Sequence, residues 1–201
     1  RAHPDTEESD IYPWMTGGHE ADAFNAYVAK ALKLDRHRMD DKDLFAFGDD
    51  VAEMKLSARR TYSVQRFDAR SASLQIQTYD YTGGAHEVIG ESSLNWDVAH
   101  ARAFTLADVF VADKPWRTFA TDFCLHDLHD QLADSDGDPE RSAVEAVVGD
   151  DANWLWGTDK ATVHFSVYTV ASFAGGEFDV DIPYAELKAY LRSDAPVLSA
   201  H

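Results

Sequence analysis

Apolar side chains recur at helical spacing in three parts of the chain, which predicts three helices. The stripes run over residues 24–32, 116–132 and 184–191. Pro115 and Pro183 stand directly before the second and third stripes, and proline is favoured at the first helical position because no N–H is needed there. The first ten residues hold four acids and little to bury, so we expect a frayed terminus there.

Apolar and polar side chains alternate in other parts of the chain, as they do in strands with one solvated face. These parts are residues 54–64, 74–77, 94–96, 163–167 and 178–182. Their connections are shorter than a parallel crossover needs, which favours antiparallel pairing. The pattern therefore predicts an α+β fold, a four- or five-stranded antiparallel sheet with about three helices packed on it. We expect residues 1–50 to form an N-terminal strand and helix region that packs with a main domain over 51–201.

Charge and length exclude several classes of protein. The chain has 201 residues with 36 acids against 18 Lys and Arg, a formal charge of −18. Binding to nucleic acid needs concentrated basic side chains, so we expect no nucleic-acid partner. No apolar run approaches the roughly 18 residues of a membrane span, so we expect no membrane contact by this segment. The single cysteine, Cys124, excludes an internal disulfide and a CxxC site.

One acidic stretch matches much of a calcium-binding loop. Asp134, Asp136, Asp138 and Glu145 fall on ligand positions one, three, five and twelve. The sixth position normally holds a glycine that allows a sharp turn, and here it is Pro139, whose φ is locked negative. We therefore expect a solvated acidic loop between a helix and a strand, and no bound metal.

Other candidate chemistry is incomplete or has a structural alternative. His126 and His129 could supply only two of the four ligands that zinc normally takes, and the acids around Cys124 work against a reactive thiolate. The sequence has no GxSxG, Walker or GxGxxG motif, so esterases, nucleotide hydrolases and dinucleotide enzymes lack support. We predict no cofactor. Trp154 and Trp156 would share a strand face, where they could stack on a sugar or pack in the core.

Several ordered motifs resemble one known family. They are Tyr81-Thr-Gly-Gly-Ala-His86, Leu94-Asn-Trp-Asp97, Phe104-Thr-Leu-Ala-Asp-Val-Phe110, the run from Phe165 to Gly176, and Ile182-Pro-Tyr184. Together they resemble the domain of unknown function shared by the RsiV-type anti-sigma factor ectodomain, which senses lysozyme, and the N-terminal module of a peptidoglycan deacetylase. Residues near Ile11 to Leu34 are similar to the region that usually precedes this domain. Glu87 and Phe173 depart from the family pattern, which has glycine and tyrosine there.

The resemblance implies an RsiV-like α+β domain over 51–201 that binds without catalysis. It implies a periplasmic or extracellular place, reached by export or by a lipid anchor upstream of Arg1. The expected partner is a cationic protein such as lysozyme, or a cell-wall glycan, and the −18 charge would attract the former. The candidate binding residues are Tyr81, Gly83, Gly84, His86, Trp154 and Trp156. The alternative is a peptidoglycan- or carbohydrate-active enzyme or a sugar-binding module, since a suitable carboxylate pair can arise by chance among 36 acids.

Overall fold

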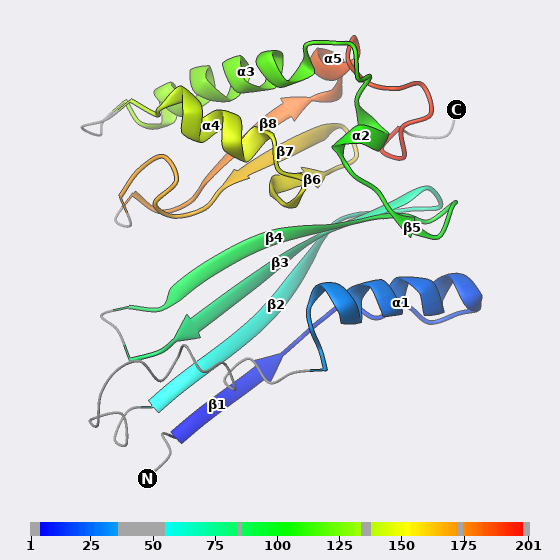
Figure 1. The fold of residues 1–201 in the computed structure, drawn as a ribbon, viewed down its shortest axis with the longest axis vertical. Coiled ribbons are helices and arrows are strands. Elements are labelled where there is room, and N and C mark those ends of the chain that lie inside the picture. Colours follow the sequence, from blue (N-terminus) through cyan, green and yellow to red (C-terminus); the bar gives the residue numbers. More distant parts are fainter. Residues whose placement is uncertain (1–4, 36–54, 84–85, 134–137, 173–174, 199–201) are drawn as a thin grey trace. The chain divides into compact units, whose positions relative to one another are not determined.

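The structure is a computed structural model that describes residues 5–35, 55–83, 86–133, 138–172 and 175–198. The α+β class is confirmed: the described strands form a five-stranded sheet, in the order β1-β2-β3-β4-β5, and a three-stranded sheet, in the order β6-β7-β8 (Figure 1). The chain divides into two compact units, Arg1–Ser63 with Ile76–Glu91, and Val64–Gln75 with Ser92–His201. We call them the first and second units and describe each by itself.

The first unit begins with a strand, where the sequence predicted a frayed end. Strand β1 (Asp5–Asp10) pairs in parallel with the start of β2 (Lys55–Phe67). Arg60 is buried and its Nη1 donates to Asp10 Oδ2 over 2.8 Å. The N–H of Ile11 also donates to the Arg60 carbonyl at 2.9 Å. These bonds hold β1 against β2. The parallel pairing of β1 makes the five-stranded sheet mixed, whereas the sequence predicted antiparallel pairing throughout.

Helix α1 (His19–Ala31) confirms the first predicted helix. Its buried side chains include Ala21, Phe24 and Val28, which lie three or four positions apart on one face. Asn25 is buried on the same helix and fastens the preceding segment: its Oδ1 accepts from the N–H of Met15 at 2.9 Å and its Nδ2 donates to the Met15 carbonyl at 2.8 Å. The remaining strands of the large sheet are β3 (Ser71–Tyr81), β4 (Val88–Asp97) and β5 (Arg102–Ala103).

The second unit packs helices on the three-stranded sheet. The sheet consists of three antiparallel strands, β6 (Trp154–Trp156), β7 (Lys160–Phe165) and β8 (Phe178–Pro183). Two helices cover one face of this sheet, α3 (Trp116–Gln131) and α4 (Arg141–Val148) (Figure 1). The predicted helix behind Pro115 and the predicted strands near residues 163 and 180 are thus confirmed. Inward-facing Val163, Phe165 and Val180 are fully buried in the core beneath the helices.

Four short elements differ from the sequence prediction. Helix α4 lies in the stretch expected to be an acidic loop, and it buries Val144, Val147 and Val148. The last predicted helix is only one turn, α5 (Tyr184–Leu187). Two further short helices were not predicted, α2 (Leu106–Val109) and the 3₁₀ turn Asp151–Asn153. Among the helices of the described ranges, none has the length and apolar character that crossing a membrane requires.

Candidate functional site

The β3–β4 hairpin carries the motif residues Tyr81, Gly83 and His86. Gly83 has φ of +88°, a left-handed conformation that glycine adopts without a steric penalty. His86 is exposed, and its Nδ1 lies 2.9 Å from the carbonyl oxygen of Glu87. Gly84 lies outside the described residues. The described part of the motif therefore shapes a turn, with Tyr81 partly buried at the end of β3.

Tyr81 lines an open hollow of about 550 Å³ in the first unit. The hollow lies where the beginnings of β1 and β2 meet the end of β3, and its other lining residues are Thr6, Glu7, Lys55, Leu56, Ser57 and Glu87. A tyrosine ring, hydroxyl groups and carboxylates are the groups that commonly orient a sugar. The structure thus brings one predicted binding residue together with strand β1, which the motif alone did not indicate.

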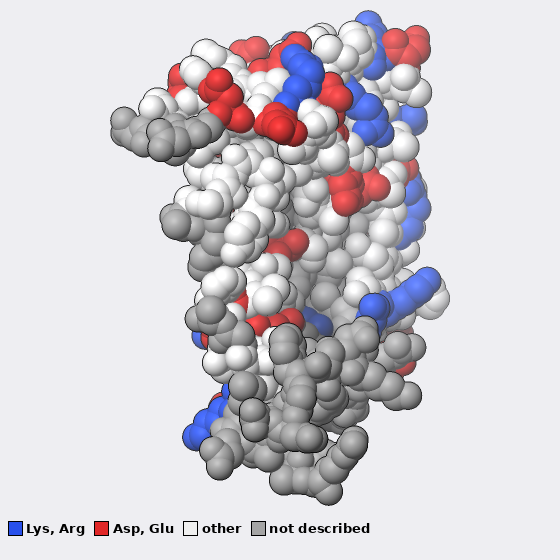
Figure 2. Space-filling view, turned by 60° about the vertical axis from the view of Figure 1, so that its left-hand side comes forward, with Lys and Arg blue, Asp and Glu red and all other residues white. Residues whose placement is uncertain are grey.

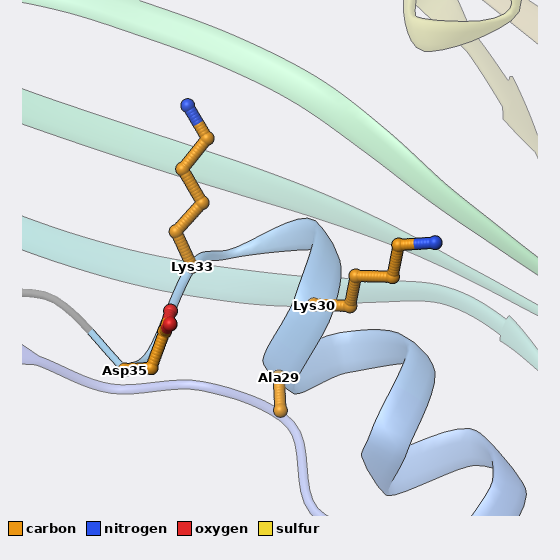
Figure 3. A pocket seen from close by; sticks show the side chains of 4 residues that line it. All are labelled: Ala29, Lys30, Lys33 and Asp35. Atoms are coloured by element: carbon orange, nitrogen blue, oxygen red, sulfur yellow. The ribbon is translucent and has the colours of Figure 1, made fainter.

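A second hollow, of about 450 Å³, lies at the end of α1 and is lined by Ala29, Lys30, Lys33 and Asp35 (Figure 3). Figure 3 shows the side chains of Lys30 and Lys33 extending in different directions. Because the two ammonium groups do not converge on one point, the hollow offers no shared contact for an anion.

The first unit also exposes a short aromatic segment between β1 and α1. Ile11, Tyr12 and Trp14 are 59%, 38% and 60% exposed. The rings of Tyr12 and Trp14 meet edge to face, with centroids 6.3 Å apart. From the sequence, this segment was noted only for its similarity to a family region. The structure shows that the segment is exposed. The acidic residues directly before it in the sequence were a sign that this part of the chain lies at the surface.

The structure buries Trp154 and Trp156, which corrects their placement among the binding residues. The two side chains are 0% and 1% exposed, and their rings stack with centroids 5.2 Å apart. Trp154 donates from Nε1 to the Val148 carbonyl at 3.0 Å. No ring face is left for a sugar, because α3, α4 and Phe110 supply the surrounding core.

Acidic side chains lie around α3 and α4 of the second unit, with Lys and Arg side chains among them (Figure 2). Residues 116–151 hold ten acids against Arg117 and Arg141. Arg141 donates to Asp122 on α3 and lies 3.5 Å from Glu145 on its own helix. These pairs are half exposed, so they add little stability. The other exposed acids, such as Asp130 and Glu140, give this surface a negative charge.

The described half of the calcium-like stretch has protein partners. Asp138 is exposed and lies 3.0 Å from His129 Nδ1, and Glu145 sits on α4 beside Arg141. Pro139 is buried between them. Asp134 and Asp136 lie outside the described residues. Glu145, predicted in a loop, is therefore a helical residue, because the buried valines of α4 order this part of the chain.

Two groups that could act as nucleophiles are held in their neutral forms. Burial, together with the charge of Asp127, raises the pKa of the Cys124 thiol to about 12. Burial also raises the pKa of Tyr184 to about 12, and its hydroxyl donates to the Gly157 carbonyl at 3.0 Å. At neutral pH neither group is ionised, so neither is activated for attack. His126 and His129 are both exposed on α3.

Residues 107–185 match the family described as "Protein of unknown function (DUF3298)". The match includes the motifs near Phe165 and Ile182, and it confirms the expected domain of unknown function for this part of the chain. A solved DUF3298 family protein from Pseudomonas aeruginosa PAO1 has a TM-score of 0.63 at 16% identity, over 92% of this chain and 84% of that protein. A DUF3298 family member from Bacteroides fragilis NCTC 9343 has a TM-score of 0.58 at 20% identity, over 90% and 72%. These likenesses show a shared fold. No curated protein matches the chain.

Proposed function

We propose that this chain is a non-catalytic binding domain of the cell envelope that recognises a cationic protein. The observation that carries the proposal is the excess of acids, −18 over the chain, with ten acids against two arginines in residues 116–151, the stretch that contains α3 and α4. A surface of one sign attracts a partner of the other sign and accelerates their encounter. The resemblance to lysozyme-sensing ectodomains makes lysozyme, a basic protein, the first partner to test.

The proposal places the domain outside the cytoplasm, as the resemblance to envelope proteins implies. It includes no catalytic step. Among the described residues that could attack a substrate, Cys124 is buried and Tyr184 is partly buried, and each has a pKa of about 12. On the basis of this resemblance we propose that the chain is exported, that it binds lysozyme, and that it is related to the anti-sigma factor and deacetylase families.

A second candidate is the binding of a cell-wall glycan in the hollow beside Tyr81. The mixed lining favours it: a tyrosine ring, the hydroxyls of Thr6 and Ser57, and the carboxylates of Glu7 and Glu87. Soluble chitooligosaccharide is a suitable probe. In this case Tyr81→Ala abolishes binding, and binding changes little with salt because the ligand is uncharged.

Titration with hen lysozyme tests the first candidate. We expect a heat of binding at 20 mM salt and an affinity that falls steadily toward 150 mM, since salt screens exposed charges. Cytochrome c, another basic protein, measures how far charge alone accounts for the affinity. If neither protein binds at low salt, the proposal is wrong.

Matched charge reversals test the role of the helical acids. Asp130→Lys with Glu140→Lys changes the charge around α3 and α4 by as much as Asp159→Lys with Glu186→Lys changes it elsewhere in the second unit. We expect the first pair to slow association with lysozyme by about tenfold at low salt, as steering effects of this size are common, and the second pair to slow it less. Equal effects would show that the overall charge attracts the partner, without a preferred surface.

A further inference from the structure

We infer that residues 7–14 are the contact surface on which the basic partner docks. On binding, the rings of Tyr12 and Trp14 are covered and the acids of β1 face basic side chains of the partner. This inference rests on the proposed function: the acidic charge of the chain attracts the partner at long range, and residues 7–14 are the surface that contacts it. We call residues 7–14 the β1 patch.

The β1 patch combines three large apolar side chains within four positions of the chain. Ile11, Tyr12 and Trp14 are each more than a third exposed, and Trp14 is 60% exposed. Exposed apolar clusters bordered by polar side chains mark interaction surfaces in soluble proteins. Tryptophan and tyrosine are also the side chains that most often dominate the binding energy of an interface.

The backbone of the β1 patch is fixed at both ends, so its exposure does not result from fraying. At one end, the β1–β2 ladder and the N–H of Ile11 are bonded to β2, the latter at 2.9 Å from the Arg60 carbonyl. At the other end, both backbone groups of Met15 bond to the buried Asn25. A surface that is already ordered loses little conformational entropy on binding, which favours affinity.

Charge identifies the kind of partner. Residues 5–14 include four acids, Asp5, Glu7, Glu8 and Asp10, and no Lys or Arg. On the paired part of β2, Lys55 lies opposite Asp5 and Arg60 pairs with Asp10. Glu7 and Glu8 are exposed and adjacent, so they point to opposite faces of the strand. A basic protein complements both faces. A second copy of this chain would bring the same negative charge against them, and like charges across an interface disfavour association.

Trp14 provides a specific probe of the β1 patch. All five tryptophans lie among the described residues, and four of them, Trp96, Trp116, Trp154 and Trp156, are at most 6% exposed. The chain labelled with 5-fluorotryptophan should give five ¹⁹F resonances, and Trp14→Phe assigns one of them. We expect unlabelled hen lysozyme to shift the Trp14 resonance over the same concentrations that produce heat in the titration, while the other four change little.

The outcomes separate this inference from the proposed function. If lysozyme binds and the Trp14 resonance does not move, the docking surface lies elsewhere and only this inference fails. If the resonance moves when the chain alone is concentrated, a second copy occupies the patch and the inference is wrong. If no basic protein binds, both proposals fail.

Substitutions then measure the contribution of the patch. Trp14→Ser should weaken lysozyme binding by more than about tenfold, as removal of a central aromatic contact often does. The matched control is Val88→Ser, which removes an equally exposed apolar side chain of the same unit, 60% exposed, outside the patch. Glu7→Lys with Glu8→Lys should weaken binding more at low salt than at high salt. A loss of affinity in Val88→Ser equal to that in Trp14→Ser would overturn the inference.

Discussion

The chain contains two aromatic pairs with the same spacing and opposite surroundings. Tyr12 and Trp14 are exposed and touch only edge to face, at 6.3 Å and an interplanar angle of 70°. Trp154 and Trp156 are almost fully buried and stack at 5.2 Å and 16°. The spacing places each pair on one side of an extended chain, but it does not decide whether that side meets solvent or protein.

The difference arises from what covers each pair. Trp154 packs edge to face against Phe110, which stacks on Trp116 at 4.2 Å, and β7 supplies Ala161 and Val163 beside β6. By contrast, Tyr12 follows an acidic strand at the edge of its sheet. A pair of aromatic residues therefore belongs to the core when apolar elements elsewhere in the sequence are shaped to cover it.

Removal of one ring from each pair should give the largest contrast in stability. Trp154→Ala should lower the free energy of unfolding by about 3–5 kcal/mol, since it leaves a large cavity in a packed core. Trp14→Ala should change it by less than about 0.5 kcal/mol, as exposed substitutions usually do. Urea unfolding followed by far-ultraviolet circular dichroism measures both. Equal losses in the two variants would refute the contrast.

A buried polar network holds the strand of the buried pair, and its disruption should have an intermediate effect. Asn95 accepts from Ser73 Oγ at 2.8 Å and donates to the Trp154 carbonyl at 3.0 Å. Ser73 Oγ in turn accepts from the N–H of Trp156 at 2.8 Å. Asn95→Ala should cost about 1–3 kcal/mol, because the buried carbonyl loses its donor.

The control for Asn95→Ala is Gln65→Ala, which removes an exposed amide on β2 and should change stability by less than about 0.5 kcal/mol. Urea unfolding measures the stability of both variants, and near-ultraviolet circular dichroism reports the environment of their tryptophans. An Asn95→Ala variant as stable as Gln65→Ala would show that the network does not support β6.

An effect smaller than that of Asn95→Ala should come from a partly exposed ion pair at the start of α2. Arg102 donates to Asp108 at 2.7 Å, and this bond, with one from the Thr105 N–H at 2.9 Å, holds the pKa of Asp108 below its ordinary value of 3.8. A carboxyl with a lowered pKa stabilises the fold above its unfolded pKa, and this contribution is lost as the pH falls through its folded pKa. Asp108→Asn should therefore cost about 0.5–1 kcal/mol at pH 7.

The pH series is the decisive part of this last experiment. The stability difference between the natural chain and Asp108→Asn should narrow as the pH falls from 5 toward 2. Thermal unfolding at each pH measures the difference. A gap that stayed constant down to pH 2 would mean that the charge of Asp108 contributes nothing.

The sequence predicted the elements whose pattern is local, and missed those that depend on distant contacts. The stripes behind Pro115 and around Phe24 and Val28 were sufficient for α1 and α3. Strand β1 was missed because its order comes from β2, about fifty positions away, and from the pair between Asp10 and Arg60. Helix α4 was missed because the acids around its three valines matched a loop.

The candidate site was less predictable than the fold for the same reason. The motif near Tyr81 was visible in the sequence, but its proximity to Glu7 and Lys55 depends on the pairing of β1 with β2. The exposure of Trp14 and the burial of Trp154 depend equally on packing that spacing does not encode.

The sealed environment of Cys124 makes this chain convenient for site-specific labelling. Since the only thiol is fully buried and remains protonated at neutral pH, a maleimide dye or spin label will attach selectively to a second cysteine introduced on the surface. The natural cysteine need not be replaced, and the core around it stays intact. Distances between labelled positions can then be measured in the otherwise unmodified protein.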